Sequence, residues 1–268
     1  MDITTILGLI LGVGFLGGAF VMEGGHITSL FQITAAMIVF GGTFAALMVS
    51  TPMEQLKQIP KILKIAFTHK SRDPLEVIDE LVILATIARR EGILALEEKI
   101  DTYDDEFFKN GVRLVVDGVD PELVRSIMET ELSFIEERHN KGAQIFEQMG
   151  GFAPTMGIIG TVMGLVHVLS NLEDAAKLGP AIALAFIATL YGVASANLAW
   201  LPIANKLKVR SKQEVLIREL MIEGILSIQA GENPNILAQK LKVFLAPTSR
   251  TKNEAAEREV GGTNVETA

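Results

Sequence analysis

Four long apolar stretches, none of which contains Asp, Glu, Lys or Arg, divide this chain of 268 residues. They lie at residues 3–22, 30–49, 148–169 and 179–204. Each reaches the ~20 residues that cross ~30 Å of hydrocarbon as a helix. Only a helix satisfies every backbone N–H and C=O group of one segment in lipid. The pattern therefore predicts an all-α membrane protein with four transmembrane helices.

The positions of Lys and Arg predict the orientation of these spans. Of the 24 residues of these two types, 13 lie between Thr51 and Glu147 and 10 follow residue 204. Only Lys177 lies between the third and fourth spans. Because cytoplasmic loops carry the excess of Lys and Arg in membrane proteins, both termini and the long middle segment are predicted to be cytoplasmic.

The polar segments set the domain organisation. We expect a first transmembrane hairpin at residues 1–50, a cytoplasmic helical domain at 51–147, a second transmembrane hairpin at 148–204, C-terminal cytoplasmic helices at 205–246 and a disordered tail at 247–268. The tail is assigned as disordered because it is polar and lacks the apolar residues that would bury a core.

Local signals place helices outside the membrane. Asp followed by Pro at residues 73–74 and 120–121, and Asn-Pro at 233–234, are typical of helix starts. Gly92 is expected to interrupt the first of these helices, whereas no turn signal separates the second from the third span. Ser211, with Glu three residues later, resembles a capping box and predicts a further helix start.

Glycines at four-residue spacing occur in the first and third spans. The pairs are Gly8 with Gly12, Gly14 with Gly18, and Gly160 with Gly164. Such spacing lets two helices approach closely in lipid. It fits packing within one chain as well as packing against a partner, so the pairs indicate close helix contacts without identifying the other helix.

Composition excludes several classes of function. The chain has no cysteine, which excludes disulfides, thiolate catalysis and Cys-based metal sites, and its four histidines are scattered. The net charge of −8 argues against binding to nucleic acid. The spans contain no Ser/His/Asp set, no Asp pair and no His-Glu metal motif. We therefore expect no catalytic residues, no metal site and no cofactor, in a protein that is not an enzyme.

The third and fourth spans carry the candidate chemistry. Counted from the outer surface, Thr161 lies about eight residues into the third span and Thr189 about ten into the fourth, so their hydroxyls are expected at similar depth. A threonine in lipid most often bonds back to its own helix. Two at matched depth also suit a polar pathway for a cation. Pro154 and Pro202 both fall near the inner surface.

The spans contain no Asp, Glu, Lys or Arg, and His167 lies near the outer end of the third span. Proteins that move ions through a bilayer usually carry an ionisable group inside it. If this chain moves ions, a partner must therefore supply the carboxylate that binds them, and the isolated chain is expected to conduct nothing specific.

These features together resemble a known family. Residues 152–166 (FAPTMGIIGTVMGLV), the exit at Pro202, the four spans and residues 88–97 (ARREGILALE) resemble the MotA/PomA/MotP family of flagellar motor stators, over about residues 1–245. The resemblance implies a pentameric ring in the bacterial inner membrane. The ring would surround two copies of a single-span MotB/PomB/MotS-type partner, whose membrane Asp carries the ion and whose outer domain binds peptidoglycan.

The resemblance also assigns roles to individual residues. The matched positions are Arg89 and Glu97 for binding the rotor protein FliG, Thr161 and Thr189 for the ion pathway, and Pro154 and Pro202 for conformational coupling. From the sequence alone, a charge such as Arg89 is usually just solvated. Proton-type members often have Ala at the position of Thr161, so its hydroxyl favours Na⁺ over H⁺ as the transported monovalent cation.

Two alternatives compete with this interpretation. An ExbB/TolQ-like proton-channel subunit, which energises outer-membrane transport, uses a similar ring but has a three-span layout with an outer N-terminus. A self-contained channel or transporter would show a charged or discontinuous site in mid-membrane, which this sequence lacks. Motility after deletion of the gene, with iron-siderophore uptake as the control, separates the stator from the ExbB/TolQ-like subunit.

Overall fold

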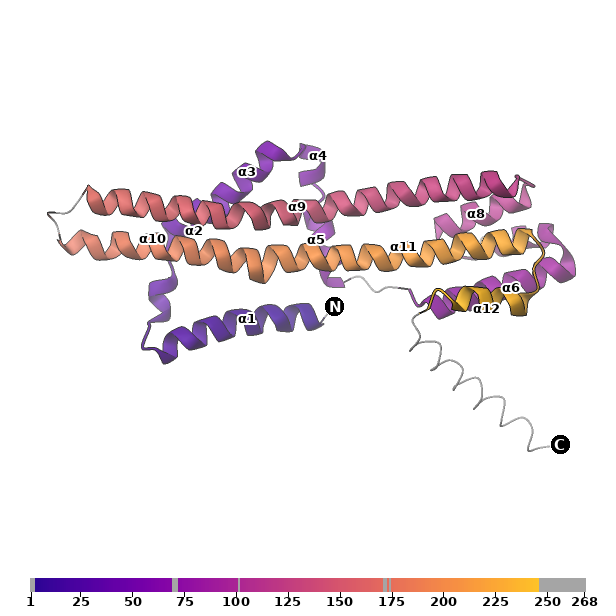
Figure 1. The fold of residues 1–268 in the computed structure, drawn as a ribbon, viewed down its shortest axis with the longest axis horizontal. Coiled ribbons are helices and arrows are strands. Elements are labelled where there is room, and N and C mark those ends of the chain that lie inside the picture. Colours follow the sequence, from indigo (N-terminus) through magenta and orange to yellow (C-terminus); the bar gives the residue numbers. More distant parts are fainter. Residues whose placement is uncertain (1–2, 69–71, 101, 171–172, 174, 246–268) are drawn as a thin grey trace, which may run out of the picture. The chain divides into compact units, whose positions relative to one another are not determined.

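The computed structural model describes residues 3–68, 72–100, 102–170, 173 and 175–245. Every regular element among these residues is helical, which confirms the all-α prediction (Figure 1). The chain forms two compact units: unit 1 comprises residues 1–70 and 137–211, and unit 2 comprises residues 71–136 and 212–268. The tail predicted at 247–268 lies outside the described residues.

Unit 1 contains the four apolar stretches. The helices long and apolar enough to cross a membrane are Ile3–Met22, Ile27–Ser50, Pro121–Leu169 and Leu178–Gln229, which confirms the four predicted spans. The helices that begin in unit 1 are α1 (Ile3–Met22), η1 (Ile27–Leu30), α2 (Ile33–Ala36), η2 (Met37–Gly41), α3 (Gly42–Ser50), α4 (Met53–Leu56), α5 (Ile59–Thr68), α10 (Ala175–Ser195), η4 (Ala196–Trp200) and α11 (Leu201–Gln229).

The first span, α1, buries none of its residues within the chain. Gly12 lies against Leu198, because a Cβ there would be 2.9 Å from the Leu198 Cδ2 atom. A Cβ at Gly8, Gly14 or Gly18 would meet nothing within 4 Å. Apart from Gly12, the predicted glycine pairs of α1 are therefore open to lipid or to a helix of another chain.

The second span is not one regular helix. The 3-10 helix η1 is followed by extended backbone at Phe31 and Gln32, then by α2, the π-helical turn η2 and α3. The span packs on the fourth span through a small buried cluster. The buried residues of this cluster are Ala35, Val39, Ile187 and Ala188.

The third and fourth spans are long helices that extend beyond the membrane. The third belongs to α9 (Pro121–Leu169), one continuous helix of 49 residues, which confirms that the helix starting near residue 121 runs into the third span. The fourth consists of α10, the π-helical turn η4 and the beginning of α11. Within unit 1, α10 runs alongside the last part of α9 (Figure 1).

Unit 2 is built around large apolar side chains. Besides the first part of α9 and the last part of α11, its helices are α6 (Pro74–Glu91), η3 (Ile93–Leu96), α7 (Glu97–Ile100), α8 (Glu106–Val116) and α12 (Pro234–Lys242). Leu81, Phe108, Met128 and Ile225 are among its fully buried side chains. Removing such apolar surface from water is the main favourable contribution to folding.

Two helix starts in unit 2 are confirmed by their caps. The Asp73 carboxylate accepts a hydrogen bond from the Leu75 N–H at 3.0 Å, and the Asn233 side chain accepts one from the Asn235 N–H at 2.9 Å. Gly92 ends α6 with a φ of 91°, a left-handed conformation that glycine adopts at little cost. The predicted interruption at Gly92 is therefore also confirmed.

The helix start predicted at Ser211 is wrong. α11 runs without interruption from Leu201 to Gln229, and Ser211 is buried inside it with its Oγ 3.3 Å from Nδ1 of His139. The hydroxyl joins two helices instead of capping one. A capping-box pattern specifies a helix start only where the preceding residues leave the helix, and no Gly or Pro interrupts residues 203–223.

Candidate functional site

The two threonines predicted to share one depth are in contact. Thr161 on α9 and Thr189 on α10 form a hydrogen bond between their hydroxyls. The Thr161 hydroxyl also lies 3.1 Å from the carbonyl oxygen of Gly157, in its own helix, and 3.0 Å from that of Ala185 on α10. The Thr189 hydroxyl lies 3.5 Å from the same Gly157 oxygen. Two hydroxyl and two carbonyl oxygens from two helices thus gather at one point.

The number of hydrogens decides what this oxygen cluster can bind. The two hydroxyls supply one proton each, and the carbonyls of Gly157 and Ala185 are acceptors only. The bond between Thr161 and Thr189 uses one hydroxyl lone pair, while the remaining donor points to a backbone carbonyl. The expected bond from Thr161 back to its own helix, at Gly157, therefore leaves lone pairs unused on the hydroxyl and carbonyl oxygens of the cluster. A cluster of this kind suits a cation and not an anion.

The threonines are held by an interface at which the two helix backbones nearly touch. A Cβ at Gly157 would lie 2.9 Å from the carbonyl oxygen of Ala188, and one at Gly192 would lie 2.5 Å from that of Ala153. Further small residues of this interface are Gly160, Gly164, Ala181 and Ala185. The predicted pair Gly160 and Gly164 is therefore used within the chain, and any larger residue would push the helices apart.

The two prolines disturb their helices differently. Pro154 lies inside α9, which remains α-helical on both sides, and it removes the amide that would bond to the Gly150 carbonyl. Pro202 is the second residue of α11, and this helix directly follows the π-helical turn η4, a type of turn often found at functional sites. Both prolines lie within about two to four helical turns of the threonine pair.

Tyr191 is a site residue that the sequence analysis did not single out. Its hydroxyl donates to the carbonyl oxygen of Leu30 and accepts a hydrogen bond from the Gln32 N–H at 3.2 Å. Its ring lies beside that of Phe40, with centroids 6.0 Å apart. Tyr191 is only two positions after Thr189, but its partner lies 161 positions earlier in the chain, so no local pattern could have indicated the contact.

Arg89 and Glu97, the residues matched to rotor binding, lie on the surface of unit 2. Arg89 is in the last turn of α6 and Glu97 is the first residue of α7, and both are exposed. Within the part of the chain that the structure describes, neither side chain forms an ion pair. Exposed charged neighbours are Arg90, Glu91 and Glu98. These charges are therefore accessible to another protein.

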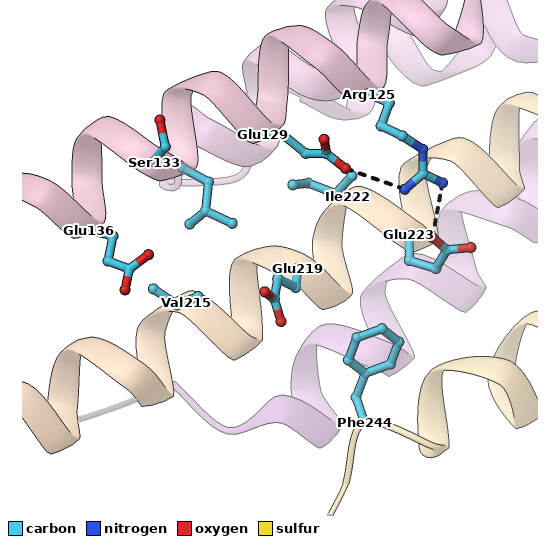
Figure 2. A pocket seen from close by; sticks show the side chains of 10 residues that line it. Arg125, Glu129, Ser133, Glu136, Val215, Glu219, Ile222, Glu223 and Phe244 are labelled. Atoms are coloured by element: carbon cyan, nitrogen blue, oxygen red, sulfur yellow. Dashed lines mark hydrogen bonds and ion pairs between the residues drawn. The ribbon is translucent and has the colours of Figure 1, made fainter.

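Unit 2 also has an acidic cleft between α9 and α11, with a volume of about 390 Å³ (Figure 2). Its lining includes Glu129, Glu136, Glu219 and Glu223, and Arg125 lies among them. Arg125 pairs with Glu129 at 3.6 Å and with Glu223 at 3.2 Å. Among the described residues, no three acidic or histidine side chains are arranged to hold a metal ion.

Glu223 is the centre of a charged network that joins three helices. Lys240 of α12 lies 2.6 Å from one of its carboxylate oxygens, and Arg125 of α9 pairs with the other. The hydrogen bond from Lys240 lowers the pKa of Glu223, and the same bond raises the pKa of Lys240. Partial burial opposes both shifts. The network ties α12 to the long helices of unit 2.

Two family models match consecutive parts of the chain. Residues 6–92 match the N-terminal region of motility protein A, and residues 99–220 match the MotA/TolQ/ExbB proton channel family. The chain is 41% identical to "Motility protein A" of Bacillus subtilis (strain 168), over 94% of each sequence. It is 40% identical to "Chemotaxis protein PomA" of Vibrio alginolyticus, over 91% of this chain and 96% of the relative.

Solved structures agree with these sequence matches. The flagellar MotAB stator complex from Bacillus subtilis matches with a TM-score of 0.88 at 40% identity, covering 94% of this chain and 99% of that chain. C. jejuni MotAB matches with the same TM-score at 33% identity, covering 92% of this chain and 97% of that chain. Both similarities therefore include the membrane spans and the helices of unit 2.

The fold defines the class: an integral membrane subunit with a cluster of hydroxyl and carbonyl oxygens between two of its four spans. The matches show that the chain belongs to the MotA/TolQ/ExbB proton channel family. Within that family it is a stator subunit of the bacterial flagellar motor, in the inner membrane. The match to the motility protein A N-terminal region and the named relatives favour this over the ExbB/TolQ-like alternative.

Proposed function

We propose that the chain combines with a single-span partner of MotB, PomB or MotS type to pass a monovalent cation and convert its flow into torque on the rotor. The similarity to MotAB complexes supports a partner of this type. The observation that carries the proposal is the oxygen cluster at Thr161 and Thr189, which lies between spans that contain no Asp, Glu, Lys or Arg. A second polypeptide must then bring the carboxylate.

In the proposed mechanism, the membrane Asp of the partner lies beside the threonine pair. A carboxylate among apolar helices is costly, and a bound cation removes most of that cost by neutralising its charge. In a pentameric ring around two copies of the partner, each neutralisation allows the ring to step around the partner. Pro154 and Pro202, beside weakened helix hydrogen bonds, supply the flexibility that couples this step to movement.

We propose Na⁺ as the coupling ion. Na⁺ needs several oxygens to replace its hydration shell, whereas a proton needs only the carboxylate that it titrates. The hydroxyls of Thr161 and Thr189, together with the carbonyls of Gly157 and Ala185, would supply such oxygens next to the partner's carboxylate. Proton transfer would not require two hydroxyls with unused lone pairs, so their presence favours Na⁺.

The coupling ion is tested by swimming speed against external Na⁺ at fixed pH and constant membrane potential. We expect speed to rise with Na⁺ and to saturate. Thr161→Ala should weaken this dependence or abolish rotation, because it removes one cation-binding oxygen. Speed that is independent of Na⁺ would identify H⁺ as the coupling ion and leave Thr161 with a packing role.

For the rotor side, we propose that both termini and unit 2 face the cytoplasm, where Arg89 and Glu97 bind FliG. The distribution of Lys and Arg supports this orientation. Exposed charges without ion-pair partners suit recognition of a protein of complementary charge, because such charges steer and orient binding. Accessibility of single cysteines placed at residues 89 and 97 tests the orientation, since the chain has no cysteine of its own.

The function as a whole is tested in a motile bacterium that lacks its own stators. Co-expression of the chain with an Asp-bearing single-span partner should restore swimming, and neither protein alone should do so. The purified chain alone, in liposomes, should show no selective conductance, because no carboxylate lies in its spans. Robust selective conductance from the chain alone would contradict the proposal.

A further inference from the structure

The second span is interrupted shortly after its start. η1 ends at Leu30, Phe31 and Gln32 are extended, and α2 begins at Ile33, all within the candidate span Ile27–Ser50. Backbone groups at such a break have no partner in their own helix. In a membrane, irregular backbone is tolerated only where protein or enclosed water satisfies these groups.

The hydroxyl of Tyr191 satisfies two of these groups at once. It donates to the Leu30 carbonyl and accepts from the Gln32 N–H at 3.2 Å, so it bridges the two sides of the break. The Tyr191 ring packs beside that of Phe40, with the ring centroids 6.0 Å apart. The bridge across the break is therefore supplied by a side chain of α10.

Tyr191 and Thr189 lie on opposite faces of α10. Residues two positions apart in an α-helix are separated by about 200° around its axis. Thr189 faces α9, where it meets Thr161, and Tyr191 faces the second span, where it meets Leu30 and Gln32. α10 therefore contacts the backbone of α9 closely on one side and is hydrogen-bonded through Tyr191 to the second span on the other.

We infer that Tyr191 is a positioning residue, whose hydroxyl holds the interrupted second span against α10 and thereby sets the position of Thr189 relative to Thr161. This inference rests on the proposed function, because cation binding at the threonine pair is what the position controls. Without the hydroxyl, the bridge across the break is lost and α10 has more freedom on that side. The oxygens of the cluster are then less well placed for a cation.

The test is Tyr191→Phe, which removes one oxygen and keeps the ring. The matched control is Tyr103→Phe, because Tyr103 is the other tyrosine of the chain and lies in unit 2. Each variant is co-expressed with the single-span partner in the stator-less host. Swimming speed is measured against the concentration of the driving cation, together with the membrane level of the chain and hydrogen exchange of the peptide that contains Gln32.

For Tyr191→Phe we expect a normal membrane level, faster exchange at Gln32, and a half-saturating cation concentration raised about fivefold, the factor corresponding to the net worth of one hydrogen bond. Maximal speed should change little, and Tyr103→Phe should match the wild type. An unchanged half-saturating concentration overturns the inference. So does a loss of speed in proportion to a lower membrane level, because that is the effect of a purely structural role.

The outcome also separates this inference from the proposed function. If the wild-type chain drives no swimming with any Asp-bearing partner, the proposed function fails. If the wild type swims and Tyr191→Phe has the same cation dependence, only the positioning role fails. A Tyr103→Phe variant with the same shift as Tyr191→Phe would overturn the inference as well, because the effect would not come from the bridge to the second span.

Discussion

Between α9 and α10 the side chains are small, and the backbones nearly touch at Gly157 and Gly192. In unit 2 the helices are separated by large apolar side chains, among them Leu81 and Phe108. The difference follows from the two solvents. Lipid tails are as apolar as leucine, so helices in a membrane gain from close packing and hydrogen bonds, whereas a unit in water gains from burying apolar surface.

The comparison predicts opposite sensitivities to mutation. The α9–α10 interface should tolerate almost no added volume, because its gaps are already closed. The core of unit 2 should suffer most when volume is removed, because the lost apolar contacts and the remaining cavity both cost stability. The hydroxyl pair depends on the first kind of packing, since its geometry is set by how closely the two backbones approach.

The largest effect is expected for Gly192→Ala. The new Cβ would lie 2.5 Å from the carbonyl oxygen of Ala153, and backbone atoms cannot move aside as a flexible side chain can. The helices must separate, and Thr161 and Thr189 separate with them. We expect motility to fall at least tenfold or to be lost, measured as swimming speed in the stator-less host.

The matched control for this prediction is Gly14→Ala in α1, where a Cβ would meet nothing within 4 Å. Alanine favours a helix more than glycine does, by about 1 kcal/mol, so the control should accumulate and swim at least as well as the wild type. Normal swimming of Gly192→Ala would show that the close approach of α9 and α10 has no role in function.

The next effect in size is that of Leu81→Ala in the core of unit 2. Leu81 is fully buried and covers Gly224 of α11. Its truncation should destabilise unit 2 by about 2–5 kcal/mol. The measurement is hydrogen exchange of α6 and α11 peptides in the full-length complex. Ile83→Ala, at a side chain that is 55% exposed, should leave exchange unchanged; equal effects would mean that the core is not where stability resides.

The sequence predicted those features that have a strong local cause. Charge-free runs located the four spans, because charges are excluded from lipid. Asp73 and Asn233 located helix starts, because a side-chain oxygen before Pro caps a helix wherever the fold allows it. The same logic was wrong at Ser211, where the helix continues and tertiary contact with His139 uses the hydroxyl.

Features that depend on contacts between distant segments were only partly predictable. The similar depth of Thr161 and Thr189 followed from counting residues along two consecutive spans of one hairpin, and the structure shows that their hydroxyls are in contact. Contacts between the two hairpins were not predicted: Leu30, at the start of the second predicted span, lies beside Tyr191, about 12 residues into the predicted fourth span, or ~18 Å along the helix. The offset comes from how the hairpins pack, for which the sequence carries no local signal.

A smaller effect on the fold, with a clear effect on function, is expected at the surface of unit 2. Arg89→Glu or Glu97→Lys should reduce motility severalfold while membrane level and hydrogen exchange stay normal, because exposed charges contribute about 0–1 kcal/mol to stability. A compensating charge reversal on the rotor should restore part of the swimming speed. Variants that disappear from the membrane would assign both residues to the fold and not to rotor binding.

The smallest effect is expected for Glu223→Gln, which tests whether pH acts on unit 2 and not on the threonine pair. The pKa of Glu223 is lowered from its ordinary value of 4.5 and that of Lys240 is raised from 10.5. The stabilising effect of the Glu223 charge is therefore full above about pH 4.5 and is lost as the pH falls through its lowered pKa. The stabilising effect of the Lys240 charge is full below pH 10.5 and is lost as the pH rises through its raised pKa.

Because the network is partly exposed, Glu223→Gln should destabilise unit 2 by about 0.5 kcal/mol at neutral pH. This loss should be seen as roughly twofold faster exchange in α12 peptides. The difference from the wild type should shrink as the pH falls through the lowered pKa of Glu223, because a protonated Glu223 is uncharged like the glutamine, while exchange in α10 stays unaffected. A difference that persists at low pH would mean that Glu223 acts through its shape and not its charge.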